Sequence, residues 1–191
     1  MKTQPTIITL PNLLTGYRFA VVPVLLFCFQ PDVGTGVSLL AFFLFLSAAL
    51  TDLADGYFAR KHKSETVLGK LMDPLADKVL VTSALIMLIP LERFPAWISF
   101  FIIARELVIT GLRGVAASSG IVIAASKLGK IKSVSQYTAL CILIFPSDLL
   151  PIPFLHDLGL AILYFSLFLT LWSGIQYFSR FQKVFLDPSR L

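Results

Sequence analysis

The sequence predicts an all-α integral membrane protein, a polytopic bundle of six transmembrane helices with both termini on the cytoplasmic side. Apolar residues make up 57% of the 191 positions and charged residues only 14%, against about 45–50% and about 25% in soluble domains. The mean hydropathy is +0.84. So few charges cannot cover a water-exposed surface, which excludes a soluble enzyme. The 17 Phe residues exclude a disordered chain.

Six apolar stretches are long enough to cross a bilayer, which requires about 20 residues in a helix. Clusters of Pro, Gly and charged residues separate them. The predicted helices cover residues 8–30, 35–60, 67–90, 95–117, 131–150 and 156–179. Their short connections leave no room for a separate soluble domain, so we expect a single domain over residues 1–191.

The orientation follows from the positions of Lys and Arg, which favour the cytoplasmic ends of transmembrane helices. With the N-terminus inside, Arg93 alone lies in an outside loop and Arg105 lies within a span. The other basic residues then lie at or near the cytoplasmic face. We therefore expect a multi-pass protein of the cell (inner) membrane. This topology, together with attraction to anionic lipid, explains the net charge of +5. We therefore expect membrane lipid as a partner and no nucleic acid.

Four aspartates lie inside the second and third predicted helices, where ionisable groups are costly and normally mark function. Asp52 and Asp55 are three residues apart and share one helix face, and Asp73 and Asp77 are four apart and share another. Because the loop between the helices is short, the four carboxylates can converge near the cytoplasmic end of an antiparallel hairpin. An all-carboxylate cluster suits Mg²⁺ or Mn²⁺ rather than zinc.

Small residues accompany these aspartates. Gly56, Ala59 and Gly69 lie beside them on the two helices, which leaves space for a phosphorylated ligand close to the backbone. Alternatively, the aspartates pair with neighbouring cations such as Arg60, and the glycines serve helix packing. Four aspartates on two adjacent helices favour the metal site.

The residues of this hairpin form one pattern at fixed spacing, Asp52-x2-Asp55-Gly56-x2-Ala59-Arg60-x8-Gly69-x3-Asp73-x3-Asp77. The pattern resembles, without departure, the signature of the CDP-alcohol phosphotransferases, which are membrane enzymes of phospholipid synthesis. Further segments extend the resemblance over nearly the whole chain, towards the bacterial members that use CDP-diacylglycerol and glycerol 3-phosphate. They are Asn12 to Arg18, Ala104 to Leu107, Gly111 to Arg113, and Gly129 to Lys132 with Gln136.

The resemblance implies a divalent-metal-dependent transfer at the cytoplasmic face. The hydroxyl of sn-glycerol 3-phosphate would attack the lipid-side phosphorus of CDP-diacylglycerol, releasing CMP and leaving phosphatidylglycerophosphate. Asp52, Asp55 and Asp73 would be the principal ligands of Mg²⁺ or Mn²⁺, and Asp77 the general base or, alternatively, a fourth ligand. The resemblance also implies a homodimer.

For CDP-diacylglycerol, the resemblance implies a site on the first three predicted helices. Its residues would be Asn12, Thr15, Asp55, Gly56, Ala59, Arg60, Gly69 and Asp73. Alternatively, Asn12 and Thr15 cap the first helix, and Arg18 extends along it to the aqueous interface.

A phosphorylated acceptor needs a second positive cluster. Arg105 and Arg113 are eight residues apart, about 12 Å along one helix face, and Lys130 and Lys132 enter the next helix. Arg binds phosphate through two donors and Lys acts as a point charge, so these four residues are predicted to bind the acceptor phosphate. Topology alone is the alternative for Lys132, and a scaffold pair with Glu106 or an aspartate is the alternative for Arg105.

Two other functions would use the same aspartates. A sibling phosphatidyltransferase would act on phosphatidylglycerol, inositol phosphate or serine, and only the acceptor pocket distinguishes it. The basic cluster argues against free serine. A small cation transporter would carry carboxylates near the bilayer midplane with a path to the other face. Here the aspartates gather at one end, which argues against transport.

Overall fold

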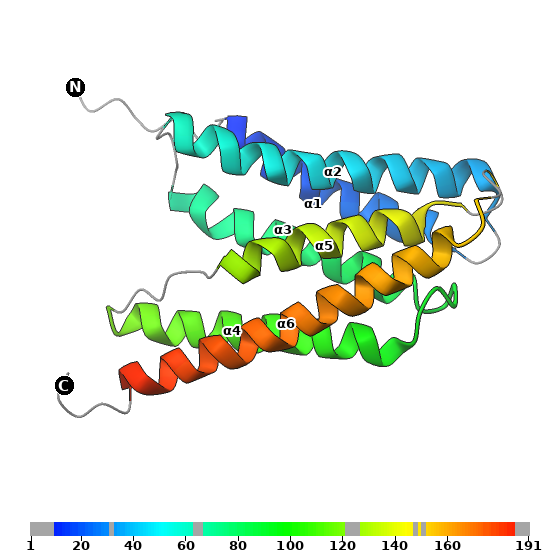
Figure 1. Cartoon of the computed structure of the whole chain (residues 1–191). Helices are drawn as coiled ribbons and strands as arrows, with labels where there is room; N and C mark the ends of the chain where they lie inside the picture. The colour runs from blue at the N-terminus through cyan, green and yellow to red at the C-terminus, as the bar shows by residue number, and fades with distance from the viewer. Residues whose placement is uncertain are drawn as a thin grey trace, which may run out of the picture. The chain divides into compact units, whose positions relative to one another are not determined.

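The computed structural model describes residues 10–30, 33–62, 67–120, 127–146, 149 and 152–185, and gives side-chain positions over 12–30, 33–51, 72–120, 128–146, 149 and 152–183. Within these residues the chain forms six α-helices and no strand (Figure 1). They are α1 (Leu10–Cys28), α2 (Thr35–His62), α3 (Val67–Met87), α4 (Ala96–Ser118), α5 (Lys127–Ile144) and α6 (Leu155–Phe185). The predicted all-α class and its six helices are confirmed.

The last two helices differ from the predicted ranges at their ends. α5 begins at Lys127 rather than residue 131 and ends at Ile144 rather than residue 150. Pro146 explains the earlier end, because proline disfavours a helical residue before it and has no N–H to donate. α6 continues to Phe185 beyond the predicted end at 179, with Lys183 in its last turn. A basic residue there complements the negative end of the helix dipole.

Contacts between helices divide the chain into two compact units. Unit 1 contains Met1–Arg93 and Leu143–Pro153, and unit 2 contains Phe94–Ile142 and Phe154–Leu191. In unit 1, α1 packs against both α2 and α3, and in unit 2, α4 packs against α6 (Figure 1). The predicted aspartate site therefore belongs to unit 1, and the predicted acceptor site to unit 2.

The core of unit 1 combines bulky and small apolar side chains. Leu25 of α1, Phe45 of α2 and Leu80 of α3 are fully buried. Ala48 and Ala76, also fully buried, lie on the two helices that α1 contacts. Small residues allow helix backbones to approach closely, which brings α1 within hydrogen-bonding range of α2 and α3.

The interior of unit 2 contains a polar stripe. Ser166, Thr170, Ser173 and Tyr177 of α6 are all buried, and their spacing of three or four residues places them on one helix face. A buried polar side chain is costly unless it is hydrogen-bonded. The stripe therefore indicates that the interior of unit 2 holds polar groups from other helices.

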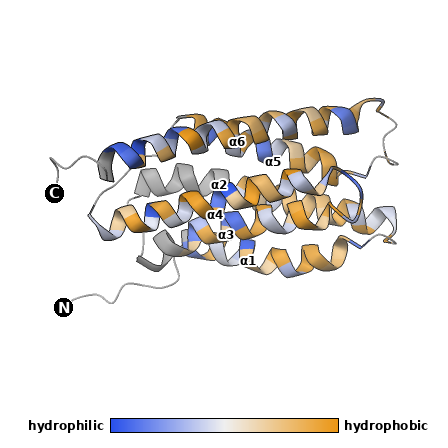
Figure 2. Cartoon of the chain, turned by 90° about the horizontal axis from the view of Figure 1, so that it is seen from below, coloured by the Kyte–Doolittle hydropathy of each residue, from blue (hydrophilic) through white to orange (hydrophobic). Residues whose placement is uncertain are grey.

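Large apolar side chains cover the outside of the helices. Phe27 is 80% exposed, Phe100 66% and Phe168 61%, whereas soluble monomers rarely expose extended apolar patches. Among the described residues, only one stretch is long and apolar enough to cross a membrane, the 29 residues Leu155–Lys183 of α6. Shorter apolar stretches cover Asn12–Cys28 and Thr35–Thr51. Figure 2 shows that most of α6 is hydrophobic and its C-terminal end hydrophilic.

Candidate functional site

The described part of the aspartate site lies in unit 1, where the first turns of α1 meet α3. Thr15 Oγ1 donates a hydrogen bond to Asp73 Oδ1. Arg18 Nη2 lies 3.9 Å from the same oxygen, and the Asp73 side chain remains 37% exposed. α1 therefore holds one oxygen of Asp73 while the carboxylate stays accessible to a ligand.

Arg18 is held inside the protein. Its side chain is 0% exposed, so the alternative in which it extends to the aqueous interface is wrong. A buried guanidinium requires an anionic partner, because leaving its charge unpaired away from water is costly. Asp73 supplies that negative charge. Beside it, the hydroxyls of Tyr17 and Ser47 lie 2.6 Å apart and join α1 to α2.

Asp77 follows Asp73 by one turn, so both carboxylates lie on one face of α3. Both residues are partly exposed, whereas Ala76 and Leu80 beside them are buried. Pro74 lies between the two aspartates within the helix. Because proline has no N–H, α3 lacks one backbone hydrogen bond directly after Asp73. The aspartate face thus borders the core of unit 1 on one side and is open on the other.

Most of the other predicted residues of this site lie outside the described side chains. They are Asp52, Asp55, Gly56, Ala59, Arg60 and Gly69. The backbones of α2 and α3 include these positions as helix, which the three- and four-residue spacings require. Asn12 lies partly exposed in the first turn of α1. Among the side chains that are described, no group of three or more His, Cys, Asp or Glu is close enough to hold a metal ion.

A charged cluster joins the three helices of unit 2. Glu106 Oε1 of α4 accepts a hydrogen bond from Arg105 Nη1 at 2.8 Å and another from Lys132 Nζ of α5. Arg105 Nη2 donates to Ser173 Oγ of α6 at 2.8 Å. The side chains of Arg105, Glu106 and Lys132 are 14%, 23% and 6% exposed. Two cations share one carboxylate, so this largely buried cluster keeps a net positive charge.

The structure brings together two of the four predicted acceptor residues. Arg105 and Lys132 meet at Glu106, so the pair of Arg105 with Glu106 that was the scaffold alternative is present in the structure. Arg113 is exposed, and its guanidinium carbon lies 5.5 Å from the centre of the Tyr177 ring, a cation–π contact. Lys130 is also exposed. Lys132 is only two positions further along the chain, so the two lysines lie on different faces of α5.

Sequence reasoning did not identify the contribution of α6. Ser173 and Tyr177 carry no charge and stand in an apolar helix, where a single hydroxyl is unremarkable. Their common spacing with Ser166 and Thr170 is the signal that could have revealed the buried face.

Gly174 of α6 allows Arg105 to pass close to the α6 backbone. A Cβ atom at Gly174 would lie 3.2 Å from Arg105 Cγ and 3.3 Å from Arg105 Nε. Such contacts are tighter than side chains normally make, so either Arg105 or α6 would have to move. Gly111 of α4 differs, because a Cβ there would meet nothing within 4 Å.

We expect Gly174→Ala to be less stable than Gly111→Ala. In a helix interior, replacing Gly by Ala stabilises by about 0.5–1 kcal/mol, and Gly111 has room for the methyl group. At Gly174 the same methyl group pushes Arg105 away from Ser173, which offsets the gain. Free energies of unfolding of both variants in detergent micelles measure the difference. Equal gains would contradict the close packing of Arg105 on Gly174.

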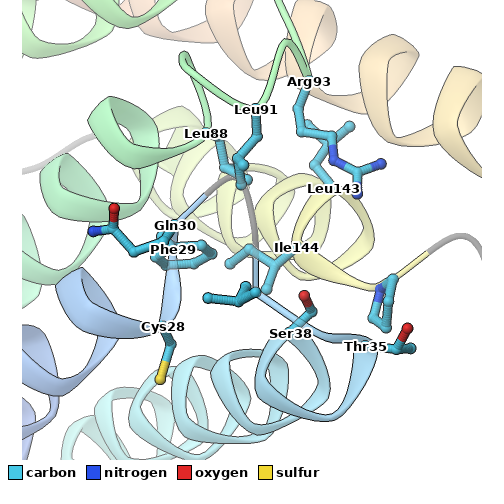
Figure 3. Close-up of a pocket in the computed structure, with 12 residues that line it drawn as sticks. Cys28, Phe29, Gln30, Thr35, Ser38, Leu88, Leu91, Arg93, Leu143 and Ile144 are labelled. Atoms are coloured by element: carbon cyan, nitrogen blue, oxygen red, sulfur yellow. The ribbon is translucent and has the colours of Figure 1, made fainter.

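A separate cavity of about 170 Å³ lies in unit 1, at the C-terminal end of α1 (Figure 3). Asp73 contacts Thr15 near the other end of this helix. Cys28, Thr35 and Ser38 line the cavity where α1 ends and α2 begins, together with Leu88 and Arg93 from the loop that follows α3. None of the predicted metal or substrate residues lines this cavity. It is therefore distinct from the candidate site.

Comparison with known proteins identifies one matching family and a set of similar enzymes. The family model for CDP-alcohol phosphatidyltransferase matches residues 8–172. A CDP-diacylglycerol–glycerol-3-phosphate 3-phosphatidyltransferase of Bacillus subtilis is 40% identical over 185 residues, covering 90% of this chain and 94% of that enzyme. An enzyme of the same name from Rickettsia felis is 38% identical over 176 residues, covering 92% and 97%. A cardiolipin synthase (CMP-forming) of Oryza sativa is 37% identical over 198 residues, covering 95% of this chain and 60% of that enzyme.

Proposed function

Because this chain belongs to the CDP-alcohol phosphatidyltransferase family, we propose that it transfers the phosphatidyl group of CDP-diacylglycerol to sn-glycerol 3-phosphate. The products are phosphatidylglycerophosphate and CMP. The observation that carries this acceptor is the net-positive cluster of Arg105, Glu106 and Lys132, because a phosphorylated acceptor needs a cationic site. The names of the relatives from Bacillus subtilis and Rickettsia felis support the same reaction.

The aspartates suit a divalent metal, on which enzymes of this family generally depend. Asp73 is accessible, and Thr15 orients one of its oxygens. Carboxylate oxygens are ligands that Mg²⁺ and Mn²⁺ prefer. We assign Asp52, Asp55 and Asp73 as principal ligands of one of these ions, with Asp77 as a further candidate. A bound metal would neutralise the diphosphate oxygens of the donor.

Asp77 is the proposed general base. The acceptor hydroxyl oxygen forms a bond to the lipid-side phosphorus, and the bond from that phosphorus to the CMP oxygen breaks, its electron pair leaving with CMP. The proton of the hydroxyl passes to a carboxylate oxygen of Asp77. Since Asp77 and Asp73 lie one turn apart on α3, the base and a metal ligand share one helix face. In the alternative, Asp77 only ligates metal and the proton passes to water.

The donor is proposed to bind around the aspartates in unit 1. The contact between Thr15 and Asp73 supports a role for the first turns of α1. The proposed residues are Asn12, Thr15, Asp55, Gly56, Ala59, Arg60, Gly69 and Asp73.

The acceptor phosphate is proposed to bind the cluster in unit 2. Arg105 offers a planar fork of donors and Lys132 a compact charge, and Glu106 fixes both. The exposed cations Arg113 and Lys130 would attract an anion from water towards this region.

We further propose that all six helices cross the cell membrane, with both termini and the aspartate site on the cytoplasmic side. The distribution of Lys and Arg supports this orientation, and the exposed apolar side chains of the helices support contact with lipid. Such an arrangement would let a donor with two acyl chains reach the aspartates from within the bilayer. We propose a homodimer on family resemblance.

We expect Thr15→Val to raise the Mg²⁺ concentration for half-maximal activity about tenfold, since groups that orient a metal ligand typically contribute 10–100-fold. The valine keeps the shape of Thr15 but cannot donate to Asp73. Thr15→Ser keeps the hydroxyl donor, so its Mg²⁺ concentration for half-maximal activity should stay near that of the parent enzyme. Metal titrations of CMP release compare the two variants, and equal metal dependence would refute the orienting role.

CMP release by the purified protein tests the acceptor. With CDP-diacylglycerol and Mn²⁺ or Mg²⁺, release is expected only when glycerol 3-phosphate is added. Release with phosphatidylglycerol, inositol phosphate or serine instead would assign a sibling reaction. Cation flux in proteoliposomes without CMP release would identify a transporter.

A further inference from the structure

Gln136 of α5 is a buried amide without a full set of partners. The residue is 4% exposed, and its Nε2 has no hydrogen-bond partner in the part of the chain that the structure describes. A leucine or methionine would fill similar space without removing an amide from water. Because buried polar groups normally find partners, Gln136 indicates a ligand that the described chain does not itself supply.

The amide stands next to the charged cluster of unit 2. Gln136 follows Lys132 by four residues, so both lie on one face of α5, about 6 Å apart along the helix axis. Lys132 in turn contacts Glu106, which also binds Arg105. Arg105 Nε and Tyr177 Oη are further buried groups without a hydrogen-bond partner among the described residues. Each helix of unit 2 thus carries a buried donor that an oxygen-rich ligand would satisfy.

The amide and the cations are suited to different groups of such a ligand. Arg and Lys match the negative charge of a phosphate. An amide donates through nitrogen and accepts through oxygen, which matches a hydroxyl. In glycerol 3-phosphate, the C2 hydroxyl stands on the carbon next to the one that carries the phosphate, and the C1 hydroxyl is the attacking group. Lys132 and Gln136 are likewise neighbours along α5, so a phosphate at Lys132 would bring the C2 hydroxyl towards Gln136.

We propose that Gln136 is a specificity-determining residue that binds the C2 hydroxyl of a phosphorylated polyol acceptor. This inference rests on the proposed function and adds a second recognised group to it. An acceptor that lacks the hydroxyl would leave the buried amide without a partner in the transition state. Sites built to bond a hydroxyl discriminate against analogues without one for this reason.

Two acceptors that differ only at C2 test the proposal. They are sn-glycerol 3-phosphate and 3-hydroxypropyl phosphate, which keeps the terminal hydroxyl and the phosphate. The parent enzyme should favour glycerol 3-phosphate in kcat/KM by about tenfold or more. In Gln136→Leu the ratio should fall to near one, because kcat/KM falls for glycerol 3-phosphate alone. Thr138→Val, at an exposed position of α5, should keep the parent ratio.

A ratio unchanged in Gln136→Leu would overturn the proposal. Thermal unfolding and the KM for CDP-diacylglycerol report whether the variant is folded. Gln136→Met, which is closer to Gln in shape, provides a second measurement of the ratio. Equal losses with both acceptors in both variants would assign Gln136 to packing and also overturn it. Failure of the parent to use glycerol 3-phosphate at all would instead refute the proposed function.

Discussion

Asp77→Asn is expected to lower the rate of phosphatidyl transfer by about 10²–10⁴-fold, the usual contribution of a general base. Asparagine has nearly the shape of aspartate but cannot take the proton of the acceptor hydroxyl. Asp77 is partly exposed on α3, so the substitution should leave the fold intact. Initial rates of CMP release at saturating CDP-diacylglycerol, glycerol 3-phosphate and Mg²⁺ measure the loss.

Asp157→Asn provides the matched control. Asp157 is exposed in the first turn of α6, and its variant should retain the parent rate. Excess metal separates the two roles of Asp77, because it would partly restore a variant that had lost only a ligand. A near-normal rate for Asp77→Asn at all pH values would exclude Asp77 as the base.

Glu106→Gln is expected to lower the free energy of unfolding by about 3 kcal/mol, the low end for breaking a buried ion pair. Glu106 is the shared partner of Arg105 and Lys132, which are 14% and 6% exposed. The glutamine keeps the shape of the side chain and removes the negative charge, leaving two largely buried cations without a counter-ion. Denaturation of the purified protein in detergent micelles, followed by circular dichroism, measures the change.

Glu92→Gln makes the same substitution at an exposed loop residue and should change the free energy of unfolding little. The double variant Glu106→Gln/Lys132→Met should recover part of the lost stability, since it removes one of the stranded cations. Equal stability of the Glu106 and Glu92 variants would mean that the cluster does not depend on its carboxylate.

The sequence predicts the helices of this protein well because the length of an apolar stretch is a direct signal. The ends of the helices are harder to predict, because they depend on single residues. Pro146 stops α5 inside an apolar run, and Lys127 begins it inside a basic one. The division into two units has no counterpart in the sequence, since it depends on which helices pack together.

The aspartate site is predictable because carboxylates are rare in apolar helices and their spacing defines a face. The side chains that surround these carboxylates are harder to predict from the sequence. An Arg near the end of a membrane helix normally reaches water, and the burial of Arg18 against Asp73 follows only from the packing of α1 on α3. Ser173 and Gly174 are small residues in an apolar helix, so their contacts with Arg105 become visible only in the fold.

The most direct test of the proposed reaction uses glycerol 3-phosphate that carries ¹⁸O in its C1 hydroxyl. If this hydroxyl attacks the lipid-side phosphorus of CDP-diacylglycerol, mass spectrometry will find ¹⁸O in phosphatidylglycerophosphate and none in the CMP released with it in equal amount. Formation of phosphatidate together with a labelled phosphodiester of CMP and glycerol 3-phosphate, or of CMP without a labelled lipid, would contradict the mechanism.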